Sequence, residues 1–440
     1  MSDQARDGPA PAAPHRVGRL TFELDGGDEA TLLRLRGEVV GGADSWIPAA
    51  LDAGFSALDL PGRTLRIGRL EVDLGALPKS GFDSAQLTEA LRRALAERLR
   101  DVPDAAHPLP VTEPAQDTLI ASFRHFLATG RLPWWSVVDS VAALAFAIAA
   151  LDVESLRSLA RRGADILATL RGAQRLVLQF SPEVAARVAA ALPAAKQGDF
   201  SAADWPKPAD KKAFEMLIAR LCRVARASMD VTTQDGDSPQ ATAVEGTRAD
   251  ASQPEKAARR DTPEEPEVDF VDGDLDIAVA DAGLVLLHPF LPALFEARGL
   301  AAAGAFLGDS EQLRAIQLVT FLAGGETTRE EPQLVMAKLL CGWPLDEPVP
   351  RETVLDAVDL AEAAELLRAV VGHWSALGQA SPAALRETFL TRPGRLRERG
   401  NAWELEVERR GADVLLARLP WTLNPVRLPW MPRPLHVVWS

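Results

Sequence analysis

Residues 228–269 read SMDVTTQDGDSPQATAVEGTRADASQPEKAARRDTPEEPEVD, and the organisation of the chain follows from them. They include no Leu, Phe or Trp, and they carry 11 acidic residues against four basic ones, a net charge of −7. A segment of this composition buries too little apolar surface to offset the entropy lost on ordering. We therefore predict a disordered acidic linker from Ser228 to Asp269, whose contour is about 140 Å.

The linker sets the predicted domain boundaries. Residues 1–14 are polar and rich in proline, and we expect a disordered N-terminus there. Residues 15–227 are predicted to form an N-terminal domain of β-strands and a helical bundle, and residues 270–440 a C-terminal helical domain. The expected fold class is α+β, predominantly helical, because helical periodicity covers most of both halves.

Composition excludes several classes of protein. Of 440 residues, 47% are hydrophobic and 25% are charged, which is typical of globular chains. The net charge of −14 argues against nucleic acid or an anionic membrane as the main partner, since both attract clustered cations. The 32 prolines exclude one continuous helical rod.

The cellular compartment is predicted to be the cytoplasm. Cys222 and Cys341 each follow a leucine and are interpreted as reduced core thiols. The first residues contain no apolar segment of the kind a secretion signal needs. The charge-free run Ser140–Leu151 is well short of the roughly 20 residues of a membrane span.

The N-terminal half begins with an internal echo. Val17–Leu24 (VGRLTFEL) recurs fifty residues later as Ile67–Leu74 (IGRLEVDL), and both alternate apolar with polar residues. We predict two half-buried strands from a duplicated unit, the first pairing with Leu32–Leu35 across the turn Asp25–Asp28. Helices are then predicted over Ser84–Arg100, Ala115–Thr129, Ser136–Leu151, Asp152–Arg162, Ser181–Leu192 and Asp210–Ala227, with the nearly all-apolar third one at the centre.

The C-terminal half places helices first and strands last. Helices are predicted over Leu291–Arg298, Ser310–Ala323, Pro332–Leu340, Thr353–Leu377 and Ser381–Leu390. Strict alternation in Ala402–Arg409, preceded by Gly400 and Asn401, predicts a small antiparallel hairpin with Arg395–Arg399. A third strand is expected at Val414–Leu416, followed by an extended tail rich in Trp and Pro that forms few ladder bonds.

No spacing of residues supplies a catalytic site. The histidines are isolated from one another, and Gly324-Gly325-Glu326 lacks the Lys and Ser or Thr of a phosphate-binding loop. Glu362 and Glu365 are interpreted as a solvated helix face. We therefore expect no enzyme activity, and no catalytic, cofactor, metal or small-molecule site.

The tetrapeptide Arg-Leu-Pro-Trp occurs three times, at Arg131–Trp134, Arg418–Trp421 and Arg427–Trp430. Proline fixes an extended backbone and tryptophan supplies a large rigid anchor. Two interpretations remain open: the tryptophans build the C-terminal core, or the tail docks on another subunit. For docking, the candidate residues are Trp134, Trp135, Trp421, Trp430, Trp439, Arg418 and Arg427.

The succession of motifs resembles the tape measure proteins of contractile injection systems, which are phage-tail-like particles. The resemblance covers nearly the whole chain except the linker. Its motifs are His15–Leu20, Phe126–Trp135 (FLATGRLPWW), Leu178–Ser181 (LQFS), Ala282–Pro292 (AGLVLLHPFLP), Lys338–Gly342 (KLLCG), Pro344–Leu345, His373–Trp374, Leu385–Leu390, Arg392–Arg395 (RPGR) and Leu428–Leu435 (LPWMPRPL).

This resemblance implies a non-enzymatic structural role. The family's chain lies with the assembling inner tube above the baseplate hub and helps set the length of tube and sheath. The expected partners are therefore tube and baseplate or hub subunits, and the expected location is the assembled particle. A physical tension remains, because two compact halves and one linker make a short ruler. The alternative is a folded assembly factor, such as a hub or cap adaptor.

Overall fold

The computed structural model describes residues 15, 17, 20–23, 29–42, 45–56, 63–67, 70–75, 84–100, 111–206, 210–234, 276–351 and 355–439. The predicted disordered N-terminus and most of the predicted linker lie outside these residues, as does the predicted turn Asp25–Asp28. The described part of the chain is predominantly helical with a small mixed sheet, so the predicted α+β class is confirmed at this level.

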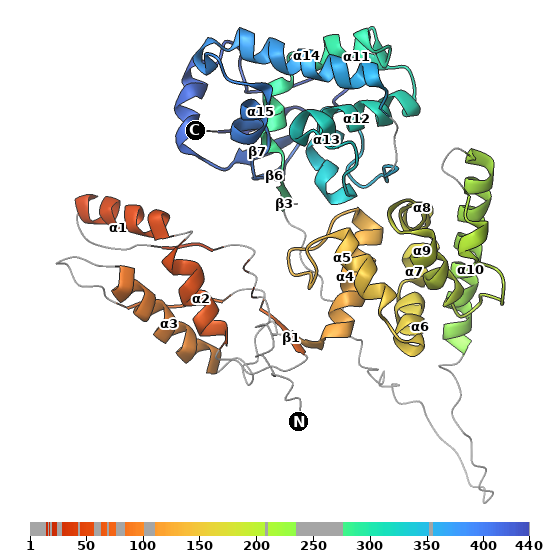
Figure 1. Cartoon of the computed structure of the whole chain (residues 1–440). Coiled ribbons are helices and arrows are strands. Elements are labelled where there is room, and N and C mark those ends of the chain that lie inside the picture. Colours follow the sequence, from red (N-terminus) through yellow and green to blue (C-terminus); the bar gives the residue numbers. More distant parts are fainter. Residues whose placement is uncertain are drawn as a thin grey trace, which may run out of the picture. The chain divides into compact units, whose positions relative to one another are not determined.

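Helices follow one another through most of the chain (Figure 1). The α-helices are α1 Glu29–Gly42, α2 Trp46–Ser56, α3 Ser84–Arg100, α4 Ala115–Thr129, α5 Val141–Ala149, α6 Val153–Arg162, α7 Ala164–Leu167, α8 Leu170–Gln179, α9 Pro182–Ala190, α10 Lys211–Gln234, α11 Leu291–Ala297, α12 Asp309–Gly324, α13 Val335–Leu340, α14 Ala357–His373 and α15 Pro382–Leu385. Shorter 3₁₀ elements are η1 Ala202–Asp204, η2 Ala282–Leu287, η3 Glu331–Leu334, η4 Ser375–Leu377 and η6 Gly411–Arg418, and η5 Arg386–Leu390 is a π-helical turn.

The strands form three small sheets. They are β1 Arg63–Arg66, β2 Val111–Pro114, β3 Asp276–Val279, β4 Ala301–Ala302, β5 Ala305–Phe306, β6 Gly394–Arg399, β7 Ala402–Val407 and β8 Leu435–Val438. β1 pairs antiparallel with β2, and β4 with β5. The largest sheet has the order β3-β6-β7-β8, in which β8 runs parallel to β7 and the other pairs are antiparallel.

The chain divides into two compact units whose limits differ from the predicted domains. Unit 1 is Met1–Phe126 with Leu132–Ala147, and unit 2 is Leu127–Arg131 with Ile148–Ser440. The helices α6–α10, predicted to belong to the N-terminal domain, therefore share unit 2 with the C-terminal half. The reason is a buried ion network, described below, that joins α8 to that half.

In unit 1, α2 packs against α3 around a small core of Ala50, Leu91 and Leu95. α3 spans the predicted residues. The described residues of the predicted strand Ile67–Leu74 form no ladder. The segment that pairs is β1, immediately before it, and its partner is β2. The alternation of Ile67–Leu74 is nevertheless real: Leu70, Val72 and Leu74 are half-buried against this core and the residues between them are exposed.

Two predictions near the N-terminus are wrong. The described residues of Val17–Leu24 are not in a strand, and Leu20 is 46% exposed rather than half-buried. Leu32–Leu35 is helical, within α1, instead of being a hairpin strand. The Leu and Arg residues there favour a helix.

The prediction is confirmed for α4 but not for α5. α4 spans the predicted Ala115–Thr129, and Gly130 ends it with a φ of 74°. α5 begins five residues later than predicted, because Ser140 rather than Ser136 accepts the hydrogen bond from the N–H of Ala143 at the start of the helix. Phe146 on α5 is 79% exposed, so the predicted central position of this helix is wrong.

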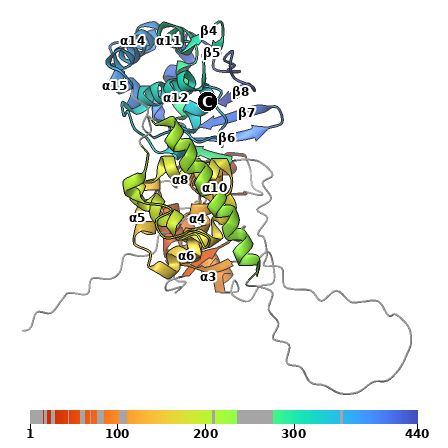
Figure 2. The ribbon, with the colours of Figure 1, turned by 90° about the vertical axis from the view of Figure 1, so that its right-hand side faces the viewer.

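In unit 2, α6–α10 are built on local signals that the sequence carries. Asp152, Thr169 and Ser181 accept hydrogen bonds at the N-termini of α6, α8 and α9. α10 packs against α7 and α8. It is the long green helix in the foreground of Figure 2. It continues to Gln234, seven residues past its predicted end, because Ser228 is buried and its hydroxyl bonds the N–H of Ala194.

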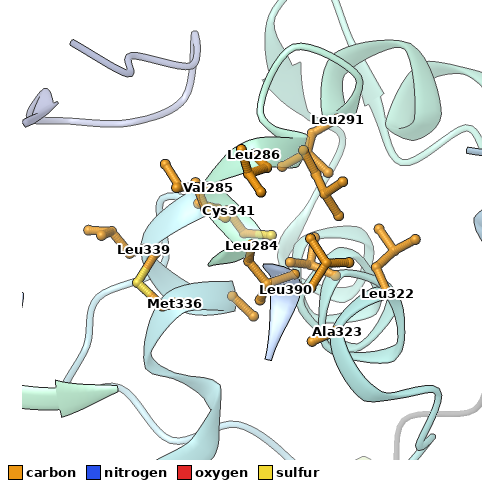
Figure 3. Packing of buried hydrophobic residues seen from close by; sticks show 14 of the residues in the cluster. Leu284, Val285, Leu286, Leu291, Leu322, Ala323, Met336, Leu339, Cys341 and Leu390 are labelled. Atoms are coloured by element: carbon orange, nitrogen blue, oxygen red, sulfur yellow. The ribbon is translucent and has the colours of Figure 1, made fainter. Parts of the chain in front are cut away.

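The C-terminal part of unit 2 has a large apolar core. η2 contributes a run of buried residues, and α12, α13 and η5 pack around it (Figure 3). Residues labelled there include Leu284, Leu286, Leu322, Met336, Cys341 and Leu390. The predicted helices occupy these positions, although Pro332–Leu340 is split between η3 and α13 and Thr353–Leu377 is shortened to α14 and η4.

The sheet departs from the prediction in its tail. The hairpin β6–β7 forms as expected, with Trp403, Leu405 and Val407 buried. The tail after Pro434 is not free of ladder bonds, because β8 joins β7 and buries alternate side chains. The predicted strand Val414–Leu416 is instead part of η6, whose turn is closed by the Asp413 carboxylate accepting from the N–H of Arg410.

No helix among the described residues is both long and apolar enough to cross a membrane.

Candidate functional site

The predicted docking residues of the first Arg-Leu-Pro-Trp copy lie in the turn after α4. Trp134 is 51% exposed, and Trp135 is half-buried with its ring edge-on to His125 at 6.4 Å. Trp134 is therefore the most exposed tryptophan of the predicted set. A docking role for this pair stays a prediction.

The tail tryptophans are anchored in the C-terminal core. The Trp421 ring meets Phe290 edge-on at 5.1 Å and also contacts Trp374. The Trp430 ring lies 4.8 Å from that of Phe306, and its indole N–H donates to the carbonyl of Leu340 at 2.8 Å. These contacts favour the core interpretation over docking for both residues.

Trp439 and the two tail arginines differ in exposure. Trp439 is only 7% exposed; its indole N–H donates to Asp413, and the Arg392 guanidinium lies over its ring at 5.7 Å. Arg418 and Arg427 are exposed, and neither has an ion-pair partner among the residues that the structure describes. Of these three candidate docking residues, only Arg418 and Arg427 are accessible to a partner, because Trp439 is buried.

A buried ion network that the sequence did not reveal lies at the centre of unit 2. Glu331, at the start of η3, accepts from Nε of Arg175 on α8 at 3.0 Å and from Nη2 of the same residue at 3.2 Å. Its Oε1 also accepts from Nζ of Lys338 on α13 at 2.7 Å. All three side chains are at most 2% exposed. We call them the Glu331 cluster.

The Glu331 cluster contains two cations and one anion, and backbone carbonyls accept the other hydrogen bonds of the two cations. Arg175 donates to the carbonyls of Leu127 and of Asp346, the latter at 2.7 Å. Lys338 donates to the carbonyls of Leu345 and Glu347. Burial lowers the pKa of Lys338, and the Glu331 carboxylate opposes that shift. Both buried cations are therefore bonded to the carboxylate and to backbone carbonyls, as a buried charge requires.

Contacts on the same side of α8 extend the link. Arg171, which is about half-exposed, pairs with Asp346 and with Glu347, whose Oε1 lies 2.6 Å from Nη2. The amide of Gln179 donates to the carbonyl of Val349 at 2.7 Å. Three side chains of α8 thus hold the segment 346–349, so α8 and the C-terminal half share one packed interface.

Several of the motifs that carry the family resemblance meet at the Glu331 cluster. Gly130, in the motif Phe126–Trp135, has a φ of 74°, and a Cβ on it would lie 2.5 Å from Oε1 of Glu331. Gln179 comes from the motif Leu178–Ser181, and Lys338 begins the motif Lys338–Gly342. Gly130 and Lys338 are therefore explained by the packing of the buried Glu331 charge, and Gln179 by its hydrogen bond to the adjoining segment 346–349.

The remaining C-terminal motifs interlock with one another. A Cβ on Gly283 would lie 1.6 Å from the carbonyl oxygen of Phe389, and the N–H of Ala282 donates to the carbonyl of Arg392 at 2.8 Å. A Cβ on Gly342 would lie 2.4 Å from the carbonyl oxygen of Trp430. The glycines in these motifs permit close backbone approach, which is a structural and not a chemical requirement.

Two of the isolated histidines, His288 and His436, have hydrogen-bonding roles. Nδ1 of His288 lies 2.9 Å from the carbonyl oxygen of Val285, and burial lowers the pKa of His288. Nδ1 of His436 lies 3.0 Å from Oδ1 of Asn424. Across the described residues, no group of three or more His, Cys, Asp or Glu side chains is placed to hold a metal ion.

One sequence signal could have pointed to the Glu331 cluster. Lys338 is the single charge in the apolar run Val335–Cys341, and an apolar helix of that kind is buried. A buried lysine requires a carboxylate and several acceptors. The second cation of the cluster, Arg175, could not be identified from the sequence, because it lies 156 residues from Glu331 in the chain.

Comparison with known protein families places the chain. Residues 14–439 match a family model described as "Contractile injection system tape measure protein". Neither the search of curated proteins nor the search of solved structures returned a match. The motif-based resemblance and the family model therefore agree over nearly the whole chain.

Proposed function

The chain belongs to the family of contractile injection system tape measure proteins, and we propose that it helps to set the length of the tube and sheath of such a particle. The observation that supports this most directly is the family match over residues 14–439. In this role the chain binds other particle subunits, with the inner tube and the baseplate or hub as the proposed partners.

A structural role is also in keeping with the site. The motifs that identify the family are used for packing, at the Glu331 cluster and between Gly283 and Phe389. Buried charges saturated by backbone carbonyls have no free group to offer a substrate. We therefore propose a non-enzymatic component.

Gene deletion tests the proposed length control. Particles assembled without this chain should have irregular or abnormal lengths when measured by electron microscopy. Complementation with the intact gene should restore the narrow distribution. An unchanged length distribution in the deletion strain would disprove a role in length control while leaving membership of the particle intact.

A second candidate function is a folded hub or cap adaptor, and the Glu331 cluster favours it. α10 ends at Gln234 and β3 begins at Asp276, and both belong to unit 2. The ion pair of Arg175 with Glu331 joins the parts of the chain on either side of residues 235–275. Pulling these parts away from each other would expose two buried cations, which is costly.

Shortening the chain between residues 236 and 269 separates the two candidates. A ruler that measures with this segment predicts tubes shorter in proportion to the residues removed, at about 3.3 Å each. A folded adaptor predicts unchanged tube length and normal assembly. Tube length in purified particles, compared with that from a chain whose segment is replaced by a shuffled sequence of equal length, gives the answer.

The docking prediction is tested at the exposed residues. Trp134→Ala removes the accessible ring, and Arg418→Glu with Arg427→Glu reverses the two unpaired tail charges. Docking through these residues predicts weaker co-purification of the chain with particles. Trp439→Phe serves as a matched control because Trp439 is buried. Unchanged co-purification of all variants would disprove docking through these residues.

A further inference from the structure

The exposed face of α10 carries a stripe of cations. Lys212, Met216, Ala219, Arg223 and Arg226 are all exposed and follow the i, i+4, i+7, i+11, i+14 spacing of one helix face. We call these five residues the α10 face. Met216, which is 62% exposed, gives the face an apolar side chain amid the charges.

The cations of α10 have no carboxylate partners. Within the residues that the structure describes, none of Lys211, Lys212, Arg220, Arg223 and Arg226 lies within ion-pair distance of an Asp or Glu. Arg220 and Arg226 donate only to backbone carbonyls, of Asp199 at 2.8 Å and of Ala168 at 3.3 Å. Other exposed arginines of unit 2, such as Arg171 and Arg368, do pair with carboxylates. α10 also carries two exposed carboxylates, Glu215 and Asp230. Its five cations outnumber these two carboxylates, so the helix is locally positive in a chain of net charge −14.

A groove with an apolar wall opens on the same face. It has a volume of about 470 Å³ and is lined by Leu170, Ala219, Cys222, Arg223 and Arg226. Leu170, the first residue of α8, is 60% exposed beside it. The groove therefore has room for an apolar side chain, and arginine guanidinium groups stand at its rim.

We propose that the α10 face is a docking surface for an acidic amphipathic segment of another protein subunit. An apolar side chain of that segment fills the groove against Leu170 and Ala219. Flanking carboxylates of the segment pair with Arg223, Arg226 and Lys212. The planar guanidinium of an arginine can bind a carboxylate through two hydrogen bonds, and the lysine ammonium binds it as a point charge. This inference does not depend on whether the chain sets length.

The chemistry of the surface selects a protein partner. Nucleic acid offers phosphates along its backbone but no aliphatic side chain for the groove, and the acidic chain as a whole repels it. A membrane surface is disfavoured by the same net charge. An acidic segment with one or two apolar anchors matches both the cations and the groove.

The test uses the full chain and a defined probe. The probe is a fluorescein-labelled amphipathic helical peptide made of Leu and Glu, and its control has the same Leu positions with every Glu replaced by Lys. Fluorescence anisotropy should show binding of the Glu peptide only, weakening with added salt. Lys212→Glu with Arg223→Glu should weaken that binding at least about tenfold, and Leu170→Asp should weaken it through the groove.

Matched variants control for general charge. Arg157 and Arg161 on α6 are an exposed pair in the same unit, one helical turn apart. Arg157→Glu with Arg161→Glu should leave peptide binding unchanged. Circular dichroism of every variant should match that of the original chain, which shows that folding is retained.

Cys222 supplies an independent readout. It lines the groove at 8% exposed, whereas Cys341, the other cysteine of the chain, is fully buried. Bound Glu peptide should slow alkylation of Cys222 by iodoacetamide, as measured by mass spectrometry. The Lys peptide should not slow it.

Several results would overturn the proposal. Equal binding of the Lys peptide, or undiminished binding by the α10 variants, would show that the α10 face does not select acidic segments. Stronger binding of single-stranded DNA or of anionic vesicles would assign the surface to another class of partner. Binding that appears only after residues 236–269 are removed would assign the face to the chain's own acidic segment.

Discussion

Two sets of cations in unit 2 are used in opposite ways. Arg175 and Lys338 are buried, share the carboxylate of Glu331 and donate their remaining hydrogen bonds to carbonyls. The five cations of α10 are exposed, and none has a carboxylate partner among the described residues. The buried cations thus have their ion-pair partner within the chain, whereas the described residues supply none for the exposed cations.

The difference follows from the cost of desolvation. A buried charge that lacks a partner destabilises the fold by several kcal/mol, so the Glu331 cluster must be satisfied internally. An exposed charge is solvated by water and costs little when unpaired, so it is free to take an external partner. Internal cations therefore fix the fold, while unpaired surface cations are available for binding.

The largest effect is expected at the Glu331 cluster. Glu331→Gln keeps the shape of the side chain but leaves Arg175 and Lys338 buried without a counter-charge. We expect the free energy of unfolding to fall by about 3–5 kcal/mol. Guanidinium denaturation of the full chain, followed by far-ultraviolet circular dichroism, measures it.

An exposed pair provides the control. Glu365→Gln on α14 removes a partner of Arg368 from a pair in which both side chains are more than half exposed. It should cost only about 0.2–0.5 kcal/mol. A loss below 1 kcal/mol for Glu331→Gln would show that the buried network does not hold unit 2 together.

Gly130→Ala should have the next largest effect. The new Cβ would approach Oε1 of Glu331 to 2.5 Å, and the residue would keep a positive φ. Gly198→Ala is the matched control, because its φ is 88° and nothing lies near its Cβ position. We expect the control to lose about 1 kcal/mol for φ alone and Gly130→Ala to lose about 1–3 kcal/mol more. Equal losses by denaturation would mean that the carboxylate moves aside freely.

Local signals in the sequence predicted much of the fold. The bounds of α3 and α4 were predicted correctly, and so was the β6–β7 hairpin, because periodicity, caps and turn residues lie within a few positions of each other. Failures occurred where pairing is non-local. β8 joins β7 from about thirty residues away, and Ile67–Leu74 alternates without finding a strand to pair with.

The site was less predictable than the fold. The repeated Arg-Leu-Pro-Trp suggested that the tryptophans dock on another subunit. In the structure Trp439 belongs to the C-terminal core and Trp430 packs against it. Lys338 lies seven residues from Glu331, but the sequence could not identify the whole Glu331 cluster, because Arg175 on α8 is 156 residues from Glu331. The α10 face depends on which side of a helix remains uncovered, and only packing decides that.

A pH effect is expected at the start of α14. The N–H of Asp359 donates to the Asp356 carboxylate, and this bond, with the charge of Arg314, holds the pKa of Asp356 below its usual value of 3.8. A lowered pKa means stabilisation that is present above pH 3.8 and is lost as the pH falls through the folded-state pKa. Asp356→Asn keeps a cap but no charge. Its stability deficit should therefore shrink below pH 3.8, and a pH-independent deficit would contradict the assignment.

The smallest effect is expected on α10. Lys212→Glu with Arg223→Glu reverses two charges, but neither side chain has a hydrogen bond or ion pair in the described part of the chain. The free energy of unfolding should therefore change by less than about 0.5 kcal/mol, measured in the denaturation assay used for Glu331→Gln. The comparison depends on this result. If the double variant lost several kcal/mol, the α10 cations would be structural like those of the Glu331 cluster. If stability is retained while binding of the acidic peptide is lost, buried and exposed cations of this unit have separate roles, because only the exposed set can exchange water for a partner's carboxylates.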